Sequence, residues 1–401
     1  MKKRILVIGL AMLMLVLTAC GGGTSAPPAD SGTASSGSDS TAAATTPASD
    51  EAIELKFVAP DTANGTDIIY FDAWRKFLYN ESGGRLILTE YGNGALVPAG
   101  EELAALRDGL ADIGKIDSMW ATGEIELNQA VCLPDTVDWP GALQSADIHM
   151  QLYEEFPELK AEFEKNGVMF LFPHYGGPTQ LQTTKKPVHT LDDLKGLNQI
   201  EVGPYASEAA KLLGMSPLSF PISENADALM KGVADGISLN YNAVGNYYSD
   251  SINYSTLCGL VQPSTNYTCF NPESWAKLPA DIQALFQGEN IRKAYTVANY
   301  LRDRGDIDGR AKLADKFEKN GLPEVYVLPD DELAKWREIV SPVKNIWIDS
   351  VGADIGSSIQ ARLTEIRPDH VWTDAKAAEA EAIIAEWQAL PLDLPNAIAN
   401  P

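Results

Sequence analysis

The sequence is poor in basic residues. Its 31 lysines and arginines face 55 aspartates and glutamates, which gives a formal net charge of −24 at pH 7. Nucleic acids and anionic lipid surfaces bind proteins through basic patches, so this deficit argues against both as partners. The acidic excess also produces a weak field that favours cations over anions near the protein.

Cysteine and histidine are scarce as well. The chain has four of each, and no histidine has metal-ligand spacing to a cysteine or to another histidine, so neither a metal nor another cofactor is predicted. Cys20 belongs to the N-terminal segment, which leaves Cys132, Cys258 and Cys269 in the body. A disulfide between Cys258 and Cys269 could form outside the cell, but we favour buried free thiols because the odd number leaves one unpaired in any case.

The motifs of common hydrolases are also missing. The sequence contains no Gly-x-Ser-x-Gly elbow, no His-Glu-x-x-His helix and no phosphate-binding loop. Several acidic residues could form a glycosidase pair, but no pattern places two of them together. The chain is therefore predicted not to be an enzyme, with an exported hydrolase as the less favoured alternative.

Long apolar runs are absent after the first twenty residues. Basic residues at positions 2–4 precede an apolar run at 5–17, which is too short to span a bilayer comfortably, so residues 1–20 are predicted to be a signal peptide. The small residues before Cys20 resemble a bacterial lipobox. This resemblance implies an exported protein whose acylated Cys20 anchors it to the outer face of the cytoplasmic membrane; an ordinary secretory signal is the alternative.

Residues 21–50 contain almost no apolar surface. Gly, Ser, Thr, Ala and Pro fill nearly all of this segment, so it is predicted to be a disordered tether with a root-mean-square reach of roughly 30 Å. The body, residues 51–401, is longer than one hydrophobic core usually supports. Two lobes are therefore expected.

Short apolar strands alternate with amphipathic helices in the body. Strands predicted at 53–59, 85–91 and 111–116 are separated by helices at 66–79 and 101–107, an order typical of a parallel sheet with helices on its faces. A helix at 144–165 and strands at 168–173, 181–184, 199–202 and 216–220 follow. Thr190 and Asp193 match a capping box. Residues from 272 onward are predicted to be almost entirely helical.

The ends of the predicted strands indicate where a ligand would bind. Open α/β sheets bind ligands beyond the carboxyl ends of their strands, and two facing lobes would place a cleft there. The polar and aromatic residues just after the strands are therefore the site candidates. They are Asp61, Thr62, Asn64, Asp117, Ser118, Trp120, His174, Tyr175, Glu201, Asn240 and Tyr241.

Several segments of the body follow a known family pattern in order and at similar spacing. Residues 187–197 include Asp193-Leu194-Lys195-Gly196, residues 213–217 form a Gly-Met-Ser-Pro turn, and residues 223–236 end in an Asp-Gly pair. Residues 83–86 and 107–113 match two earlier motifs. Together these segments resemble the TRAP-type solute receptors, the DctP-like family.

The resemblance implies an α/β fold with two lobes, similar to type II periplasmic binding proteins, with mixed sheets, a long hinge helix and a helical C-terminal part. It places residues 51–175 mainly in lobe 1, residues 176–270 mainly in lobe 2 with crossover strands, and residues 271–401 in a helical region that packs on both lobes. It also implies closure around a small-molecule solute. The solute would pass to a small and a large membrane subunit driven by an ion gradient; a receptor for an ATP-driven importer or for a sensor is the alternative.

The chain departs from this family at the arginines that bind carboxylates. Family members carry an Arg in the strand after the Asp-Leu-Lys-Gly motif, where its guanidinium pairs with a substrate carboxylate. Here Glu201 takes that place if one residue is inserted, and Ile200 does so without the insertion. Where a second family Arg is expected, Thr179 or Gln180 stands.

These departures predict the charge of the solute. A buried carboxylate without a cationic partner loses several kcal/mol of solvation, so organic acids are expected to bind poorly. A cationic amine or a quaternary ammonium, the slightly preferred class, would pair with Glu201 and stack on Tyr175, Trp120 or Tyr241. A neutral solute would use polar side chains, including Asn240, which lies where the family places a polar ligand contact. The alternative for Glu201 is an exposed residue at a strand end.

Overall fold

The computed structural model of the protein describes residues 51–60, 66–92, 94–118, 120–121, 123–220, 222–261 and 265–392. All of them belong to one compact unit, Ala48–Pro401. The predicted signal peptide with Cys20, the predicted tether, and Asp61, Thr62 and Asn64 lie outside the described residues. Within the described part, no helix is long and apolar enough to cross a membrane.

Five strands of the described chain form a first sheet in the order β2-β1-β3-β10-β4. β1 pairs in parallel with β2 and β3, as the alternation of strands and helices predicted, whereas β10 runs antiparallel between β3 and β4. Helices α1 and α2 connect the first three strands. The bounds are β1 (Ile53–Val58), α1 (Thr66–Glu81), β2 (Leu86–Tyr91), α2 (Glu102–Arg107), β3 (Ile113–Asp117), β4 (Met169–Tyr175) and β10 (Thr265–Phe270).

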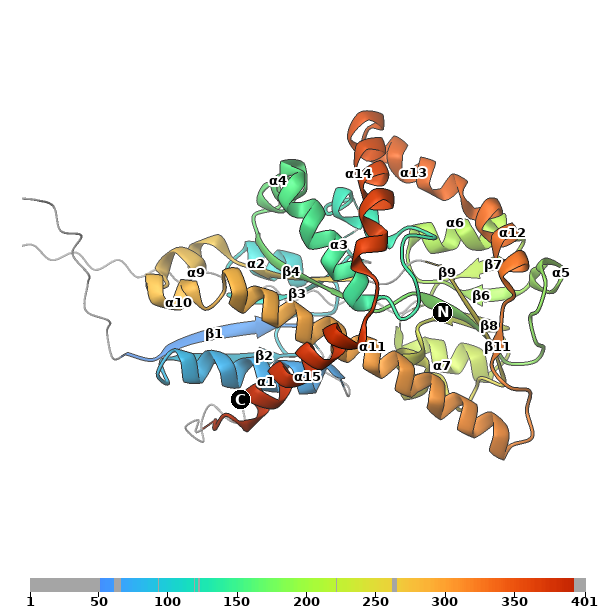
Figure 1. The fold of residues 1–401 in the computed structure, drawn as a ribbon, viewed down its shortest axis with the longest axis horizontal. Helices are drawn as coiled ribbons and strands as arrows, with labels where there is room; N and C mark the ends of the chain where they lie inside the picture. The colour runs from blue at the N-terminus through green and yellow to red at the C-terminus, as the bar shows by residue number, and fades with distance from the viewer. Residues whose placement is uncertain are drawn as a thin grey trace, which may run out of the picture. The chain divides into compact units, whose positions relative to one another are not determined.

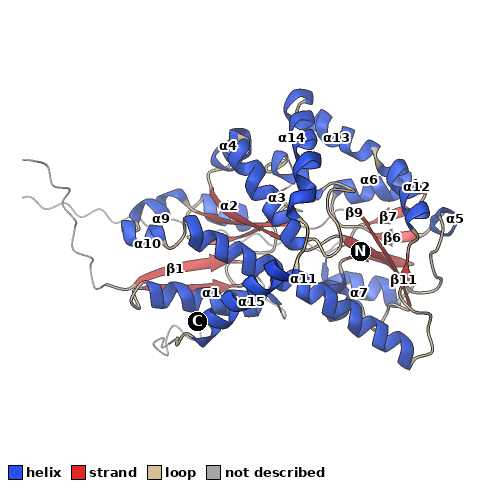
Figure 2. Ribbon diagram, viewed as in Figure 1, coloured by secondary structure: helices blue, strands red, loops and turns tan. Residues whose placement is uncertain are grey.

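A second sheet has the order β11-β9-β5-β8-β6-β7, and Figure 2 shows the strands of the two sheets as separate red groups. β6 pairs in parallel with β7 and β8, so the residues that follow β6 and β8 lie at the same edge. The capping box of Thr190 and Asp193 forms at α5 as predicted. The bounds are β5 (Thr179–Thr183), α5 (Leu191–Leu194), β6 (Asn198–Ile200), α6 (Pro204–Leu212), β7 (Ser216–Leu218), α7 (Ile222–Met230), β8 (Gly236–Leu239), α8 (Tyr241–Ala243), β9 (Tyr254–Val261) and β11 (Tyr326–Val327).

The helix predicted at residues 144–165 is in fact two helices. α3 (Ala142–Glu155) ends before Phe156, and α4 (Pro157–Lys165) begins at Pro157. Proline lacks the N–H that would continue the hydrogen-bond ladder, and it disfavours helical geometry in the residue before it. Phe156 is accordingly extended, with φ −118° and ψ 96°. The prediction of one continuous helix was wrong.

A helix of 32 residues, α11 (Gly288–Lys319), contacts β4 of the first sheet and α8, the helix that follows β8 of the second sheet. It packs against α1, α3 and β4 and also against α8, and Figure 1 shows it in orange beside both groups of strands. A Cβ at Gly309 would lie 2.2 Å from the backbone oxygen of Tyr241, so the close approach of α8 requires glycine there. The helix thus holds the two sheets together.

The rest of the described C-terminal part is mainly helical, as predicted. Trp74 of α1 is fully buried. Its ring lies edge-on to Phe172, with the centroids 5.7 Å apart, and to Phe286, with the centroids 6.0 Å apart. This packing fixes the first sheet against the helices. They are α9 (Pro272–Lys277), α10 (Ala280–Ala284), α12 (Asp330–Val340), α13 (Pro342–Val351), α14 (Ala353–Ile366) and α15 (Asp374–Ala389).

Candidate functional site

One pocket lies at the carboxyl end of β6, and we call it the Glu201 pocket. Its volume is about 310 Å³, which suits a small molecule. It combines the end of β6, the start of α6 and Trp120, which follows β3 of the first sheet. Two predicted site residues, Glu201 and Trp120, are thus brought together. The lining residues are Trp120, Ile200, Glu201, Val202, Gly203, Pro204, Ser207, Ser219, Phe220 and Asn225.

Glu201 is buried in this pocket, with 3% of its surface exposed. Its backbone N–H donates to the oxygen of Leu218 over 3.0 Å, and its Oε1 accepts a hydrogen bond from Ser238 Oγ over 2.7 Å. Burial raises the pKa of Glu201 well above its usual range, and the Ser238 hydrogen bond opposes this only in part. The alternative of an exposed residue at a strand end is therefore wrong.

Asn225 is a pocket residue that the sequence prediction missed. It lies on α7, is 3% exposed, and its side chain hydrogen-bonds to Tyr248. It does not follow a strand, so the rule about strand ends could not identify it. The one signal in the sequence is a polar residue one helical turn before the buried Ala228 and Leu229, on the face that α7 turns inward.

Trp120 presents an aromatic ring to the pocket, with 43% of its surface exposed. Gly100 packs against it, and a Cβ on that residue would come within 3.3 Å of Trp120. Among the described lining residues there is no Lys, Arg or His. Glu201 therefore has no cationic partner within the described lining.

Tyr175 and Tyr241 are placed in the core rather than on the described lining of this pocket. Both are fully buried. The Tyr175 hydroxyl lies 2.8 Å from His149 Nδ1, and the Tyr241 hydroxyl lies 3.1 Å from Ser255 Oγ. These contacts give both hydroxyls a partner inside the protein. Solute stacking on either ring stays a prediction.

Of three further predicted site residues, Gln180 and Asn240 accept hydrogen bonds from the backbone, and Thr179 is buried without a partner for its hydroxyl. Gln180 Oε1 accepts hydrogen bonds from the backbone N–H groups of Cys258 and Gly259 over 2.9 and 2.8 Å. Asn240 Oδ1 accepts from the backbone N–H that is third after it, and so caps α8. Thr179 is buried, and its Oγ1 has no hydrogen-bond partner in the described structure. None of the three lines the Glu201 pocket as described.

A buried cluster of charges lies beside α1, β3 and β4. Arg302 Nε donates to Asp67 Oδ1 over 2.8 Å, and Lys115 Nζ and His174 Nε2 lie 3.4 and 3.3 Å from the same carboxylate. Burial would raise the pKa of Asp67, but the charges of Arg302 and Lys115 outweigh it and hold the pKa well below its usual range. The adjoining cavity of about 20 Å³ has room for one water molecule. The Arg302 guanidinium is thus paired with the Asp67 carboxylate inside the protein.

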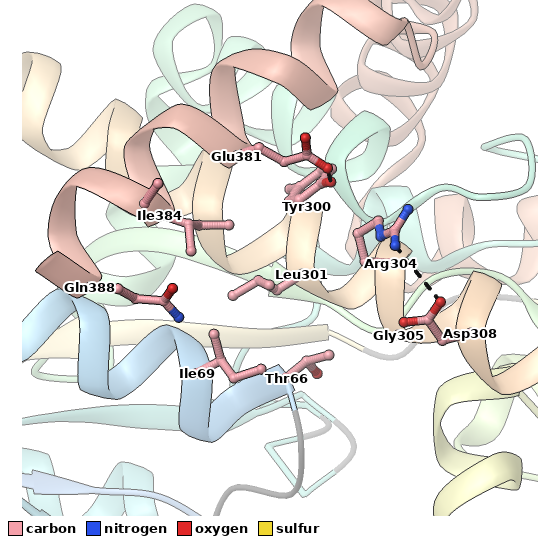
Figure 3. A pocket seen from close by; sticks show the side chains of 11 residues that line it. Thr66, Ile69, Tyr300, Leu301, Arg304, Gly305, Asp308, Glu381, Ile384 and Gln388 are labelled. Atoms are coloured by element: carbon pink, nitrogen blue, oxygen red, sulfur yellow. Dashed lines mark hydrogen bonds and ion pairs between the residues drawn. The ribbon is translucent and has the colours of Figure 1, made fainter.

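A second hollow of about 310 Å³ lies where α1, α11 and α15 meet. Figure 3 shows that Tyr300 and Glu381 point toward each other and that Arg304 reaches Asp308. The first pair is hydrogen-bonded, and the ion pair spans 3.9 Å. Because these polar groups already satisfy one another, the hollow offers a solute less than the Glu201 pocket does.

The cysteines and acidic residues form no other candidate centre in the described part of the chain. Cys132, Cys258 and Cys269 are buried thiols, as we favoured from the sequence. No group of three or more His, Cys, Asp or Glu side chains among the described residues could hold a metal ion.

The sequence model described as "DctP: Bacterial extracellular solute-binding protein, family 7" matches residues 59–349. The chain belongs to this DctP family. Its similarity to the C4-dicarboxylate-binding periplasmic protein DctP of Rhodobacter capsulatus is 24% identity over 331 residues, covering 80% of this chain and 94% of that protein.

Solved structures show the same DctP fold. A TRAP periplasmic solute binding protein from Desulfovibrio salexigens has 21% identity and a TM-score of 0.68, covering 79% of this chain and 96% of that one. A TRAP solute binding protein from an unidentified marine microbe, described as specific for aromatic acid ligands, has 18% identity and a TM-score of 0.70, with 80% and 100% covered. The predicted fold class is confirmed. The chain is an exported solute-binding protein, as its family shows, and not an enzyme.

Proposed function

We propose that this DctP-family protein is the receptor of a TRAP-type secondary transporter and binds an amine or a neutral polar solute in the Glu201 pocket. The observation that carries the solute class is the buried Glu201 in a described lining without a cationic side chain. A carboxylate beside it would lose its solvation without gaining a guanidinium partner. The solute would bridge Trp120 and the end of β6, and it would favour the closed form by its differential affinity for that form.

An organic acid is the second candidate, because the relatives' printed names refer to C4-dicarboxylates and to aromatic acids. A thermal-shift panel of amines, polyols and carboxylic acids on the purified protein separates the two classes. A ligand that binds only the native state raises the melting temperature, so amines or polyols should produce the selective rise. A rise confined to dicarboxylates would refute the charge argument.

The proposed membrane partners are the small and large TRAP subunits. A receptor for an ATP-driven importer or for a sensor is the alternative. The neighbouring genes separate these cases. A small four-helix membrane protein beside a large protein with many spans supports the TRAP assignment, whereas an adjacent ATPase with a phosphate-binding loop supports the importer.

The proposed attachment to the membrane is an acyl chain on Cys20. Polar, low-complexity sequence follows this cysteine, as a tether would require. Cys20→Ser should abolish incorporation of labelled palmitate and move the protein from the membrane fraction to the soluble fraction. Unchanged labelling of the variant would exclude Cys20 as the attachment point.

A further inference from the structure

The Glu201 pocket contains two buried oxygen atoms that accept no hydrogen bond. Oε2 of Glu201 and Oδ1 of Asn225 have no partner in the described structure, although both residues are only 3% exposed. Buried polar atoms in native proteins are nearly always satisfied by protein or by a bound molecule. Two such atoms on residues that line the same pocket therefore indicate a ligand that supplies hydrogen-bond donors.

Neighbouring hydrogen bonds fix both groups in place. Glu201 Oε1 is occupied by Ser238 Oγ over 2.7 Å, and Gln199 Nε2 approaches the same hydroxyl over 3.3 Å, which leaves Oε2 for the pocket. The side chain of Asn225 is hydrogen-bonded to Tyr248. The two free oxygens come from different elements, since one follows β6 and the other lies on α7.

The donor that fits these oxygens best is a protonated nitrogen. Without a cation in the described lining, burial favours the neutral form of the Glu201 carboxyl in the empty pocket. A cation bound against Oε2 would reverse this preference, because an opposite charge within a few ångströms stabilises the carboxylate. The Trp120 ring on the side of the first sheet could stack on the organic part of the solute or contact its charge.

Resting on the proposed function, we propose that the pocket selects a primary or secondary ammonium, whose N–H groups donate to Glu201 Oε2 and Asn225 Oδ1. When the ammonium enters, the Glu201 O–H bond breaks and its proton passes to solvent, so each binding event releases one proton. A quaternary ammonium has no N–H and leaves both oxygens unsatisfied. A carboxylate has no N–H to donate to Asn225 Oδ1, and its negative charge would oppose the ionisation of Glu201.

Isothermal titration on the purified full chain tests this inference with matched probes: phenethylamine, putrescine and propylamine, each beside its fully N-methylated, hydroxyl and carboxylate counterpart. At least one amine should bind at least tenfold more tightly than its counterparts. Its dissociation constant should fall about tenfold for each pH unit raised while Glu201 is protonated, because one proton is released. The enthalpy in phosphate and in Tris buffers gives the number of protons released.

Variants locate the effect. Glu201→Gln keeps the shape of the side chain and should weaken amine binding at least tenfold while abolishing its pH dependence. Asn225→Ala should weaken binding but keep the proton release. Glu208→Gln is the matched control, since this partly exposed carboxylate on α6 pairs with Lys211 and does not line the pocket. Its affinity and pH dependence should equal those of the wild type.

The results that would overturn the ammonium inference differ from those that would overturn the proposed solute site. Carboxylates that bind more tightly than amines, and lose affinity in Trp120→Ala, would overturn the ammonium inference while leaving a solute receptor at this pocket. Amine binding that persists unchanged in Glu201→Gln would also overturn it. If no probe of any class binds in a way that depends on Trp120 or Glu201, both the inference and the proposed solute site fail.

Discussion

Replacing Asp306 by Asn should make the free energy of unfolding depend less on pH, by the amount that one titrating carboxyl contributes. Asp306 lies on α11 and is 1% exposed. Its Oδ1 accepts from the backbone N–H of Asn242 over 3.0 Å, and its Oδ2 accepts from Trp139 Nε1 over 2.5 Å. One turn earlier, Asp303 is also buried and accepts from the first two backbone N–H groups of α3 over 2.7 and 2.9 Å. The two carboxyl groups hold α3 and α8 to the same helix.

Burial raises the pKa of both groups to about 7, against a hydrogen-bonding effect that lowers it. In the unfolded chain the value is near 3.8. Between these values the native state binds more protons than the unfolded state, so the free energy of unfolding falls as pH rises. One pKa unit corresponds to about 1.4 kcal/mol, and both states are partly ionised at the two ends of this range, so each carboxyl contributes a loss of about 3 kcal/mol from pH 4 to pH 7.

Urea unfolding of wild type and Asp306→Asn at pH 5, 6 and 7 measures this contribution. The difference between the two free energies should change by about 1.4 kcal/mol from pH 5 to pH 6 and by less from pH 6 to pH 7, where the native carboxyl begins to ionise. Asn retains only one acceptor, which lowers stability by an amount that does not depend on pH, so the slope is the diagnostic quantity. The charge of Asp306 is one of the causes that raise the pKa of Asp303, so removing it should lower that pKa.

Asp308→Asn is the control for this experiment, because its carboxylate is exposed on the same helix. Its pH profile should run parallel to that of the wild type. The reasoning is refuted if the profile of Asp306→Asn is parallel as well, since the buried carboxyl would then exchange no proton on unfolding.

Three further variants test other contacts. Gly309→Ala should lower the free energy of unfolding by at least 1–3 kcal/mol in a urea titration, because its Cβ would collide with the backbone of α8. Gln180→Leu should lower it by about 1–3 kcal/mol or more in the same assay, since the buried N–H of Cys258 and the partly buried N–H of Gly259 lose their acceptor. Burial lowers the pKa of His149 to about 3, so native stability is lost as pH falls below the unfolded value of 6.5. His149→Gln should flatten that acid limb, as measured by unfolding at pH 4–7.

The sequence was most informative where a simple rule of topology applied. Glu201 and Trp120 each follow a predicted strand, so the rule that ligands bind beyond strand ends, applied to two facing lobes, selected both as site candidates. The same rule selected Tyr175 and Tyr241, but it could not show that His149 and Ser255 occupy their hydroxyls. Those partners come from elements remote in the chain, and their positions depend on packing rather than on local pattern.

The residues that the sequence did not reveal lie on helices. Asn225 resembles any polar position of a short helix until α7 is seen to turn it into the pocket. The 32 residues of α11 include several acidic side chains at similar spacing, and no local signal separates the buried Asp303 and Asp306 from the exposed Asp308. The helices that pack against α11 determine which of its faces is buried. The break at Pro157, by contrast, was readable from the residue itself.

Strand β8 connects the pocket to the long helix, and this allows their two responses to pH to be separated. Ser238 on β8 holds the Glu201 carboxyl, and four residues later Asn242 donates its backbone N–H to Asp306. Protons bound at Glu201 should govern solute affinity and also contribute to the unfolding profile, because burial raises its pKa, whereas those at Asp306 should affect unfolding alone. Glu201→Gln should therefore remove the pH dependence of binding while keeping the contribution of Asp306 to the unfolding profile. Asp306→Asn should do the converse: it should keep the pH dependence of binding and lose its own contribution to the unfolding profile. Binding and unfolding titrations of both variants measure whether protonation of one carboxyl changes the pKa of the other.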